Sequence, residues 1–97
     1  MKLNKKDIAA IKKYFAGIPV NKAYIFGSFA RNEADEDSDV DILVDLDYRQ
    51  PIGLRFFTFQ EELARLLNRN VDLVTEGGLS KYVRPYVEKD KILIYER

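Results

Sequence analysis

The first apolar run of the chain has the spacing of an amphipathic helix, with lysines on the opposite side. Asn4 precedes this run and has the type of side chain that caps a helix N-terminus. Gly17 and Pro19 follow the run, and both residue types end helices. The apolar face of this predicted helix consists of Ile8, Ile11, Tyr14 and Phe15.

Four short segments with apolar or alternating residues predict strands. Residues 23–26 form a short apolar run, residues 40–46 alternate with aspartates, and residues 71–74 form another apolar run. Residues 92–95 predict a fourth strand, which we expect at an edge of the sheet.

Three further helices are predicted between these strands. Ser28 can cap a short helix that runs to Arg31. Ser80 can cap a last helix, and Pro85 must kink that helix or lie near its start. Residues 54–67 predict a strongly amphipathic helix whose apolar residues are Leu54, Phe57, Leu63, Leu66 and Leu67.

Helices and strands therefore alternate along the chain, with no repeat or low-complexity linker between them. This order is typical of one compact α/β (α+β) domain. We expect residues 1–97 to form a single small domain with a mixed, mostly four-stranded sheet flanked by helices. The apolar content of 46% is ordinary for a globular fold and does not change this expectation.

The composition excludes several classes of function, because the chain contains neither cysteine nor histidine. Disulfides, cysteine- or histidine-ligated metals and Ser-His-Asp or Cys-His catalysis are therefore excluded. The 16 basic and 16 acidic side chains balance, which disfavours general nucleic-acid binding. No apolar run has the length of a signal peptide or a membrane span, so we expect a cytoplasmic protein.

Acidic residues are concentrated in one part of the chain. Eight of the 16 lie between Glu33 and Asp47, without any lysine or arginine among them. Such a cluster is ordinarily a solvated loop, but a bound cation also relieves the repulsion of like charges. Asp39 and Asp41 lead into an apolar strand, and side chains two residues apart share a face, roughly 6.6 Å apart along the strand. Mg²⁺ binds through one or two such carboxylates together with substrate phosphates.

Asp72 interrupts the apolar run of residues 71–74. An aspartate in this setting is costly unless it is paired, bound to a metal or on the exposed face of a half-buried strand. If this strand lies beside residues 40–46, Asp72 completes a triad with Asp39 and Asp41.

Gly27 and Ser28 follow the first predicted strand directly. Glycine at this point lets the backbone approach a phosphate, and a helix start offers free N–H groups. Arg31 lies one turn later, within reach of a phosphate or an acidic partner. Most Gly-Ser turns are structural, so this turn indicates a phosphate site only when it is considered together with the aspartates. The glycine-rich motifs of P-loop and Rossmann proteins are absent.

The order of these residues resembles the Gly-Ser…Asp-x-Asp signature of the polymerase-beta-like nucleotidyltransferase superfamily. More narrowly, it resembles the MNT group of minimal nucleotidyltransferases, including the spacing of ten residues between Ser28 and Asp39. Asn32 departs from the glycine that the family commonly has there, although asparagine tolerates a left-handed backbone. The segments that carry the resemblance are Gly27-Ser28-Phe29-Ala30-Arg31, Ser38-Asp39-Val40-Asp41-Ile42-Leu43-Val44 and Asn70-Val71-Asp72-Leu73-Val74.

The resemblance implies a nucleotidyltransferase fold, two Mg²⁺ ions and ATP as the substrate. It implies that Asp39 and Asp41 bind both metals, and that Asp72 binds one and helps to activate the acceptor hydroxyl. Attack on the α-phosphate would then expel pyrophosphate. The residues implied to bind the nucleotide are Gly27, Ser28, Arg31 and Ser38.

We expect the acceptor or a second chain to supply much of the site, because the catalytic elements occupy most of the 97 residues. The resemblance implies an antitoxin whose partner is an HEPN-type toxin, with AMP transferred onto a tyrosine of that toxin. Some aromatic residues exceed the needs of a small core and are candidates for an interface, although each taken singly is expected in the core. These residues are Phe56, Phe57, Phe59, Tyr82 and Tyr86.

Two other functions remain open at this point. The fold can mask a partner by contact alone, as a non-catalytic antitoxin, or it can transfer a nucleotide to a small molecule. An oligomer is compatible with either function. Lys81 and Arg84 are further candidates for contact with the base or the partner.

Overall fold

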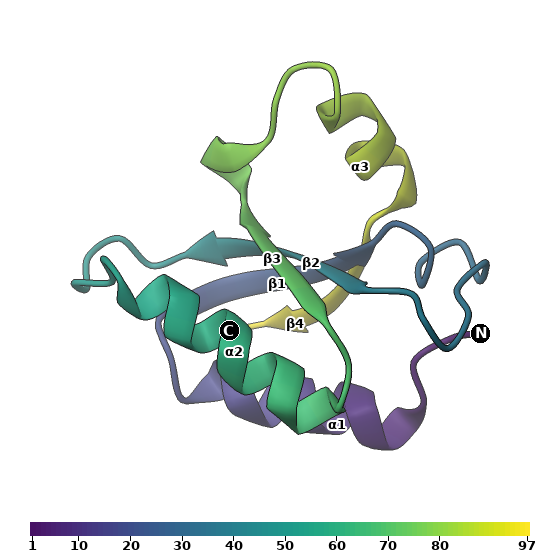
Figure 1. Ribbon diagram of the computed structural model, residues 1–97. Helices are drawn as coiled ribbons and strands as arrows, with labels where there is room; N and C mark the ends of the chain where they lie inside the picture. Colours follow the sequence, from purple (N-terminus) through teal and green to yellow (C-terminus); the bar gives the residue numbers. More distant parts are fainter.

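The computed structural model describes all 97 residues, and one four-stranded sheet lies at its centre (Figure 1). The strands follow one another in the order β3-β2-β1-β4. None of the helices combines the length and the apolar character that crossing a membrane requires. The elements are α1 (Lys5–Ala16), β1 (Val20–Phe26), β2 (Val40–Leu46), α2 (Arg55–Leu67), β3 (Val71–Thr75), the 3-10 turn η1 (Glu76–Gly78), α3 (Arg84–Asp90) and β4 (Ile92–Glu96).

The predicted first helix is confirmed, and local chemistry determines both of its ends. Asn4 Oδ1 accepts a hydrogen bond of 2.7 Å from the backbone N–H of Asp7, as expected of an N-cap. Gly17 follows the last helical residue, and its N–H donates to carbonyls of the final turn. Ile11 and Phe15 are fully buried, so the predicted apolar face contacts the core.

The predicted α/β class with a mixed four-stranded sheet is confirmed. β1 pairs antiparallel with both β2 and β4, whereas β2 pairs parallel with β3. A parallel pair needs a crossover connection, and α2 provides it. β1 begins at Val20 instead of the predicted Ala23, because Val20 is buried and already pairs with Leu46 of β2.

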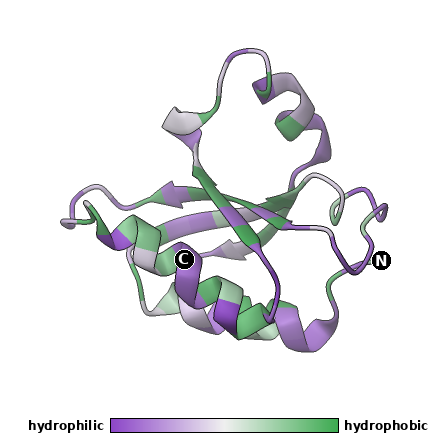
Figure 2. Cartoon of the chain, viewed as in Figure 1, coloured by the Kyte–Doolittle hydropathy of each residue, from purple (hydrophilic) through white to green (hydrophobic).

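The two faces of the sheet have different surroundings. α1 and α2 cover one face (Figure 1), and Figure 2 shows apolar residues along β2 and β3 and polar residues in the loop between β1 and β2. On β2, Val40, Ile42 and Val44 are fully buried in the main core against these helices. Because side chains alternate along a strand, Asp41 and Leu43 lie on the other face.

α3 lies over part of this second face (Figure 1). Val87 of α3 and Leu43 are buried outside the main core. The predicted cap at Ser80 is wrong, because α3 begins at Arg84 and its N-cap residue is Val83, which makes no side-chain cap hydrogen bond. Ser80 Oγ instead accepts a hydrogen bond of 3.2 Å from the N–H of Val83 in the turn before the helix, and Pro85 occupies the first turn as expected. The remainder of the second face is open, and it includes the exposed Asp72.

Two predictions about helices are wrong in part. Residues 28–31 form turns and not a short helix. The amphipathic helix at residues 55–67 exists, but Leu54, Phe57 and Leu66 are 82%, 61% and 47% exposed. Residues spaced by four positions form the face that packs on the sheet instead. The buried residues of that face are Phe59, Leu63 and Leu67.

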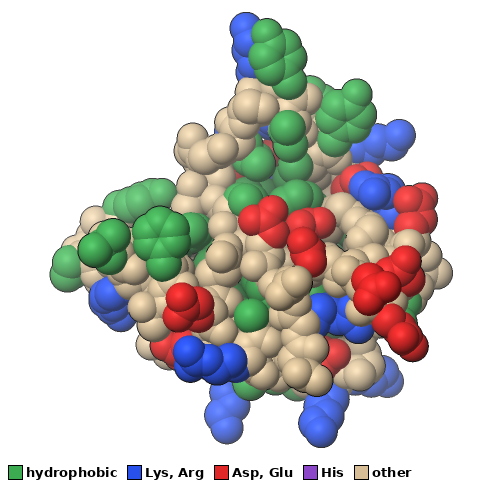
Figure 3. Space-filling model, in the orientation of Figure 1, with side chains coloured by type: hydrophobic (Ala, Val, Ile, Leu, Met, Phe, Trp, Pro, Cys, Tyr) green, Lys and Arg blue, Asp and Glu red, His purple; other side chains and the backbone are tan.

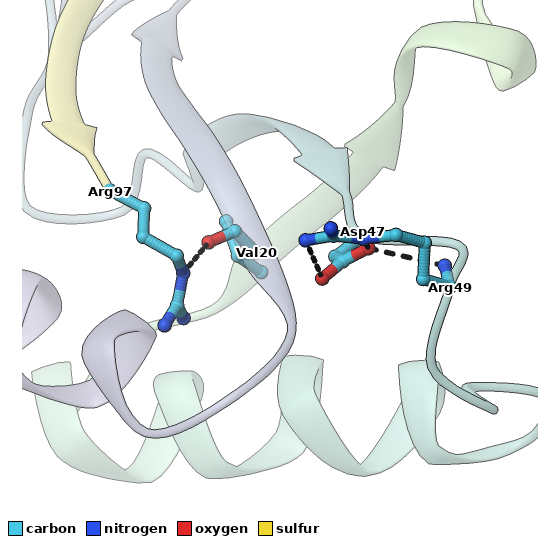
Figure 4. A network of polar contacts seen from close by, with 4 residues as sticks. All are labelled: Val20, Asp47, Arg49 and Arg97. Atoms are coloured by element: carbon cyan, nitrogen blue, oxygen red, sulfur yellow. Dashed lines mark hydrogen bonds and ion pairs between the residues drawn. The ribbon is translucent and has the colours of Figure 1, made fainter.

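Arg97 joins the end of β4 to the turn between α1 and β1 (Figure 4). Its guanidinium donates hydrogen bonds to the carbonyls of Phe15 at 3.2 Å, Ile18 at 2.6 Å and Val20 at 3.1 Å. The carbonyls of Phe15 and Ile18 also accept backbone N–H donors, at 3.3 Å from Ile18 and 2.8 Å from Val20, so Arg97 adds a charged donor to a turn that already has backbone hydrogen bonds.

Asp47 forms a second polar cluster just after β2 (Figure 4). Its carboxylate accepts hydrogen bonds from Nε of Arg49 at 2.9 Å, from Nη2 at 3.1 Å and from the backbone N–H at 3.1 Å. The hydrogen bond from the Arg49 side chain is the largest of the effects that lower the pKa of Asp47 from 3.8 to about 2.

We predict that Asp47→Asn lowers the thermal unfolding midpoint at neutral pH and that this difference shrinks with acidification. A depressed pKa in the folded state adds stability above the ordinary pKa, and this stability is lost as the pH falls toward the folded value. The difference between the two proteins should therefore decline between 3.8 and about 2 on the pH scale. Calorimetry at several pH values measures it, and a difference that is equal at pH 7 and pH 2 would contradict the prediction.

Candidate active site

A turn with a left-handed residue at each end follows β1. Gly27 has a φ of +72°, which glycine adopts without strain, and Asn32 has a φ of +61°, which asparagine tolerates. The N–H of Arg31 donates to the carbonyl of Gly27 at 3.1 Å, and the N–H of Glu33 donates to the carbonyl of Ser28 at 2.9 Å. Only four residues separate the two left-handed positions, so they form one turn and not the predicted helix.

The missing side chain of Gly27 makes room for the carboxylate of Asp41. Asp41 lies opposite Phe26 in the β1–β2 pair, directly before the turn. A Cβ on Gly27 would overlap Oδ2 of Asp41 and would lie 3.2 Å from its Cγ. Glycine is therefore required here for two reasons, its positive φ and the close approach of the aspartate.

The parallel pairing of β2 with β3 brings Asp72 level with Asp41. Both residues lie on the sheet face opposite the main core, where Asp41 is half-buried and Asp72 is exposed. Figure 3 shows acidic side chains grouped over β2 and β3, between apolar side chains near α3 and near the start of α2. The structure thus brings two of the three predicted carboxylates together beside the glycine turn.

Asp39 does not lie on the strand with Asp41, contrary to the prediction from the sequence pattern. The residue is exposed and precedes the first residue of β2, so the strand itself does not hold it. Its charge still raises the pKa of Asp41, which places the two carboxylates within electrostatic range. No three acidic side chains converge closely enough to form a complete metal site. The donor set fits Mg²⁺, which takes one or two carboxylates and its other ligands from water and phosphates.

Asp41 is the carboxylate whose protonation the site changes most. Its pKa rises from 3.8 to about 6, first because burial disfavours the charged form and then because Asp72 and Asp39 repel it. Arg31 acts in the opposite direction and lowers this pKa. Like charges held together in this way are stabilised by a cation between them.

Arg31 and Ser38, two of the predicted nucleotide residues, already have partners within the chain. Arg31 donates from Nη1 to Asp90 at 2.6 Å and from Nε to Glu33 at 3.1 Å. Ser38 Oγ accepts a hydrogen bond of 2.9 Å from the N–H of Asp35, and it lies 3.2 Å from the carboxylate of the same residue. Arg31 therefore lies beside the site, and the Ser38 hydroxyl shapes the loop before β2.

Arg69 organises the acidic loop, although sequence reasoning did not single it out. Its Nη1 donates to the carbonyls of Asp35, Glu36 and Ser38 at 2.9 to 3.2 Å. Its guanidinium also lies 5.1 Å from the ring centre of Phe29 in the glycine turn. The only signal in the sequence is a basic residue just before the third strand, which is too common a feature to identify this role.

Lys81 and Arg84, the candidates for contact with the base or the partner, lie just before α3 and at its first residue. Arg84 forms an ion pair of 3.1 Å with Glu76 and also donates to its carbonyl at 2.7 Å, so this arginine holds α3 to η1. Lys81 is exposed, and its Nζ lies 5.3 Å from the ring centre of Tyr82. Neither basic side chain belongs to the group formed by Asp41, Asp72 and Gly27.

Several curated proteins have sequences similar to this chain. Protein adenylyltransferase MntA of Thermococcus cleftensis is 40% identical over 75 residues, which is 77% of this chain and 75% of that protein. A Methanocaldococcus jannaschii protein, described as a candidate protein adenylyltransferase, is 43% identical over 76 residues, or 77% of this chain and 76% of its own length.

Solved structures with the same fold include two toxin–antitoxin complexes. A crystal structure of a toxin–antitoxin with AMP-PNP contains a chain that is 26% identical, with a TM-score of 0.77 over 98% of this chain and 75% of that chain. The MNT antitoxin in complex with a tri-AMPylated HEPN toxin of Shewanella oneidensis has a TM-score of 0.74. That antitoxin is only 22% identical over 98% of this chain and 74% of its own, so it shows likeness of fold alone.

The family model described as polymerase beta, nucleotidyltransferase matches residues 9–97. The match includes the glycine turn, the aspartates of β2 and Asp72 of β3. The chain therefore belongs to the polymerase beta nucleotidyltransferase family.

Proposed function

We propose that this nucleotidyltransferase moves AMP from ATP onto a hydroxyl group of a partner protein, in a reaction that depends on Mg²⁺. The observation that carries the proposal is the position of Asp41, between the Gly27 turn and Asp72, with a raised pKa. A half-buried carboxylate crowded by like charges is suited to a divalent cation, and a glycine turn is suited to phosphates.

The aspartates have distinct roles in this proposal. Asp39 and Asp41 would hold two Mg²⁺ ions, and Asp72 would hold one of them. When bound, the ions neutralise the phosphate oxygens and support in-line displacement. Asp72 also accepts the proton of the acceptor hydroxyl, whose oxygen forms a bond to the α-phosphorus while the bond to pyrophosphate breaks. Positioning and charge neutralisation then account for most of the rate enhancement, as in other phosphoryl transfers.

The loop after β1 holds the triphosphate in this proposal. Backbone N–H groups at Gly27 and Ser28 face the phosphates, and the Ser28 hydroxyl adds a further donor. Arg31 contributes positive charge from the end of the same turn. Ser38 acts more indirectly, because its hydroxyl is engaged with Asp35 and fixes the loop that carries Asp39.

A partner protein is the acceptor that we favour, and we propose an HEPN-type toxin with a target tyrosine, so that this chain acts as an antitoxin. Relatives at 40% identity or above are described as protein adenylyltransferases, and a structural neighbour at 26% identity is a toxin–antitoxin with AMP-PNP. Five surface hollows have linings that include none of the three aspartates, which favours a protein acceptor over a small molecule.

Exposed aromatic side chains occur at the start of α2 and in the region of α3, and Figure 3 shows apolar side chains near both of these elements with acidic side chains between them, which supports contact with a partner. Phe57 at the start of α2 is 61% exposed, and Tyr82 and Tyr86 near α3 are 75% and 72% exposed. The other two aromatic candidates for an interface belong to the core instead, because Phe59 is buried and Phe56 packs against the main cluster.

We predict that Asp39→Asn slows transfer strongly without abolishing the complex. With ATP and Mg²⁺, the intact mass of a co-purified HEPN-type partner should increase by the mass added with AMP. The substitution should slow this gain by about a hundredfold or more, the size of a lost electrostatic contribution to catalysis.

Asp37→Asn is the matched control, because it removes a neighbouring exposed charge from the same loop and should leave the rate unchanged. Neutralisation of the partner by Asp39→Asn, with no mass gain in the original pair, would instead support the non-catalytic antitoxin.

We predict that Gly27→Ala weakens ATP binding and lowers stability together. The added methyl group overlaps the Asp41 carboxylate, and alanine is strained at a φ of +72°. The loss of unfolding free energy should be about 1–3 kcal/mol. Chemical denaturation and isothermal titration with Mg²⁺-ATP measure the two effects.

Gly77→Ala is the control for this substitution, because a Cβ there meets no atom within 4 Å. If Gly27→Ala binds ATP as tightly as the original protein, the glycine turn is not the phosphate site.

A further inference from the structure

Asp90 reaches the glycine turn from a distant part of the chain. The β1–β4 pairing places Ile92 opposite Ile25, so the chain entering β4 passes the end of β1 beside Gly27. Oδ2 of Asp90 accepts a hydrogen bond of 2.6 Å from Nη1 of Arg31, across 59 positions of sequence. This contact links the end of α3 to the proposed phosphate site.

Asp90 is the better shielded of the two acidic partners of Arg31. Its side chain is 13% exposed, whereas that of Glu33 is 64% exposed. Water screens an exposed ion pair, while a short, charge-assisted hydrogen bond away from water is stronger. Glu33 and Asp90 therefore hold the Arg31 guanidinium between them, through Nε and Nη1, and Asp90 is the more buried of the two partners.

The stability of α3 does not explain an aspartate at this position. Asp90 is the last residue of that helix, where the helix dipole disfavours a negative charge. The residue makes its hydrogen bond with the turn that follows β1 and not with its own helix. The Asp90 carboxylate therefore holds the turn that follows β1 and adds no hydrogen bond within α3.

Arg31 retains donors for a ligand while it is held in this way. Nε and Nη1 each contact one carboxylate, and a guanidinium has five N–H groups in a fixed fork, so donors on Nη2 are available. The positive charge acts on Asp41 and lowers its pKa, so the guanidinium is within electrostatic range of the acidic site.

We propose that Asp90 is a positioning residue, which holds the Arg31 guanidinium in the orientation that binds a phosphate of ATP. This inference rests on the proposed function above, since it requires ATP at the glycine turn. It assigns to the end of α3 a role in nucleotide affinity, although Asp90 itself contacts no nucleotide.

Isothermal titration of the protein with ATP in the presence of Mg²⁺ tests the proposal. Asp90→Asn should raise the dissociation constant about tenfold, the effect of one lost charge-assisted hydrogen bond to a phosphate. Asp90→Glu should restore most of the affinity, because it returns the charge. Glu88→Gln is the matched control, because Glu88 is a carboxylate on the same helix but pairs with Lys91 and not with Arg31. This substitution should leave the ATP affinity unchanged.

A double-mutant cycle separates positioning from a general effect of structure. If Asp90 acts through Arg31, Asp90→Asn should cause no further loss of ATP affinity in a protein that already carries Arg31→Ala. Additive losses would overturn the proposal, as would ATP binding by Asp90→Asn that is unchanged or tighter.

Arg31→Lys tests the proposal instead if Asp90→Asn does not fold at the assay temperature. Lysine keeps the charge but lacks the rigid fork, so ATP affinity should fall by about the same factor. Unchanged affinity would show that the orientation of Arg31 does not matter and would overturn the inference. A parent protein that fails to bind ATP would instead contradict the proposed function.

Discussion

The repulsion between Asp41 and Asp72 is the constraint on which the functional site depends. Parallel pairing of β2 with β3 puts the two residues in register, and the turn at Gly27 closes over one side of Asp41. The pKa of Asp41 rises to about 6 under the combined effect of burial and neighbouring acids. Carboxylates with strongly raised pKa values are frequent at functional sites, and this arrangement suits the cation and the phosphate of the proposed reaction.

The rest of the fold keeps this pair in place. α1 and α2 bury one face of the sheet, which leaves the other face free for the carboxylates. Arg69 holds the acidic loop by its carbonyls, and Arg31 connects the glycine turn to Asp90 at the end of α3. Three separate segments of the chain therefore converge on the site, each held by a hydrogen-bonded arginine or by strand pairing.

Much of this arrangement is predictable from local pattern. Asn4 as a helix cap, the four strands and the glycine before the aspartates follow from residue chemistry and periodicity. The pairing of β2 with β3, which brings Asp72 to Asp41, remained a condition in the sequence argument because strand order is a property of the whole chain. Contacts between distant residues, such as Arg31 with Asp90, leave no periodic signal. The exposure of Leu54 and Leu66 was missed because helix periodicity alone does not show which side faces the sheet.

The most direct test of the site is diffraction from crystals grown with Mn²⁺ and a non-hydrolysable ATP analogue. Mn²⁺ takes the same oxygen ligands as Mg²⁺ and gives an anomalous signal that locates it. The account predicts manganese bonded to Asp41, with the triphosphate against Gly27 and Ser28. Manganese or nucleotide bound elsewhere on the surface, with Asp41 and Asp72 free of both, would contradict it.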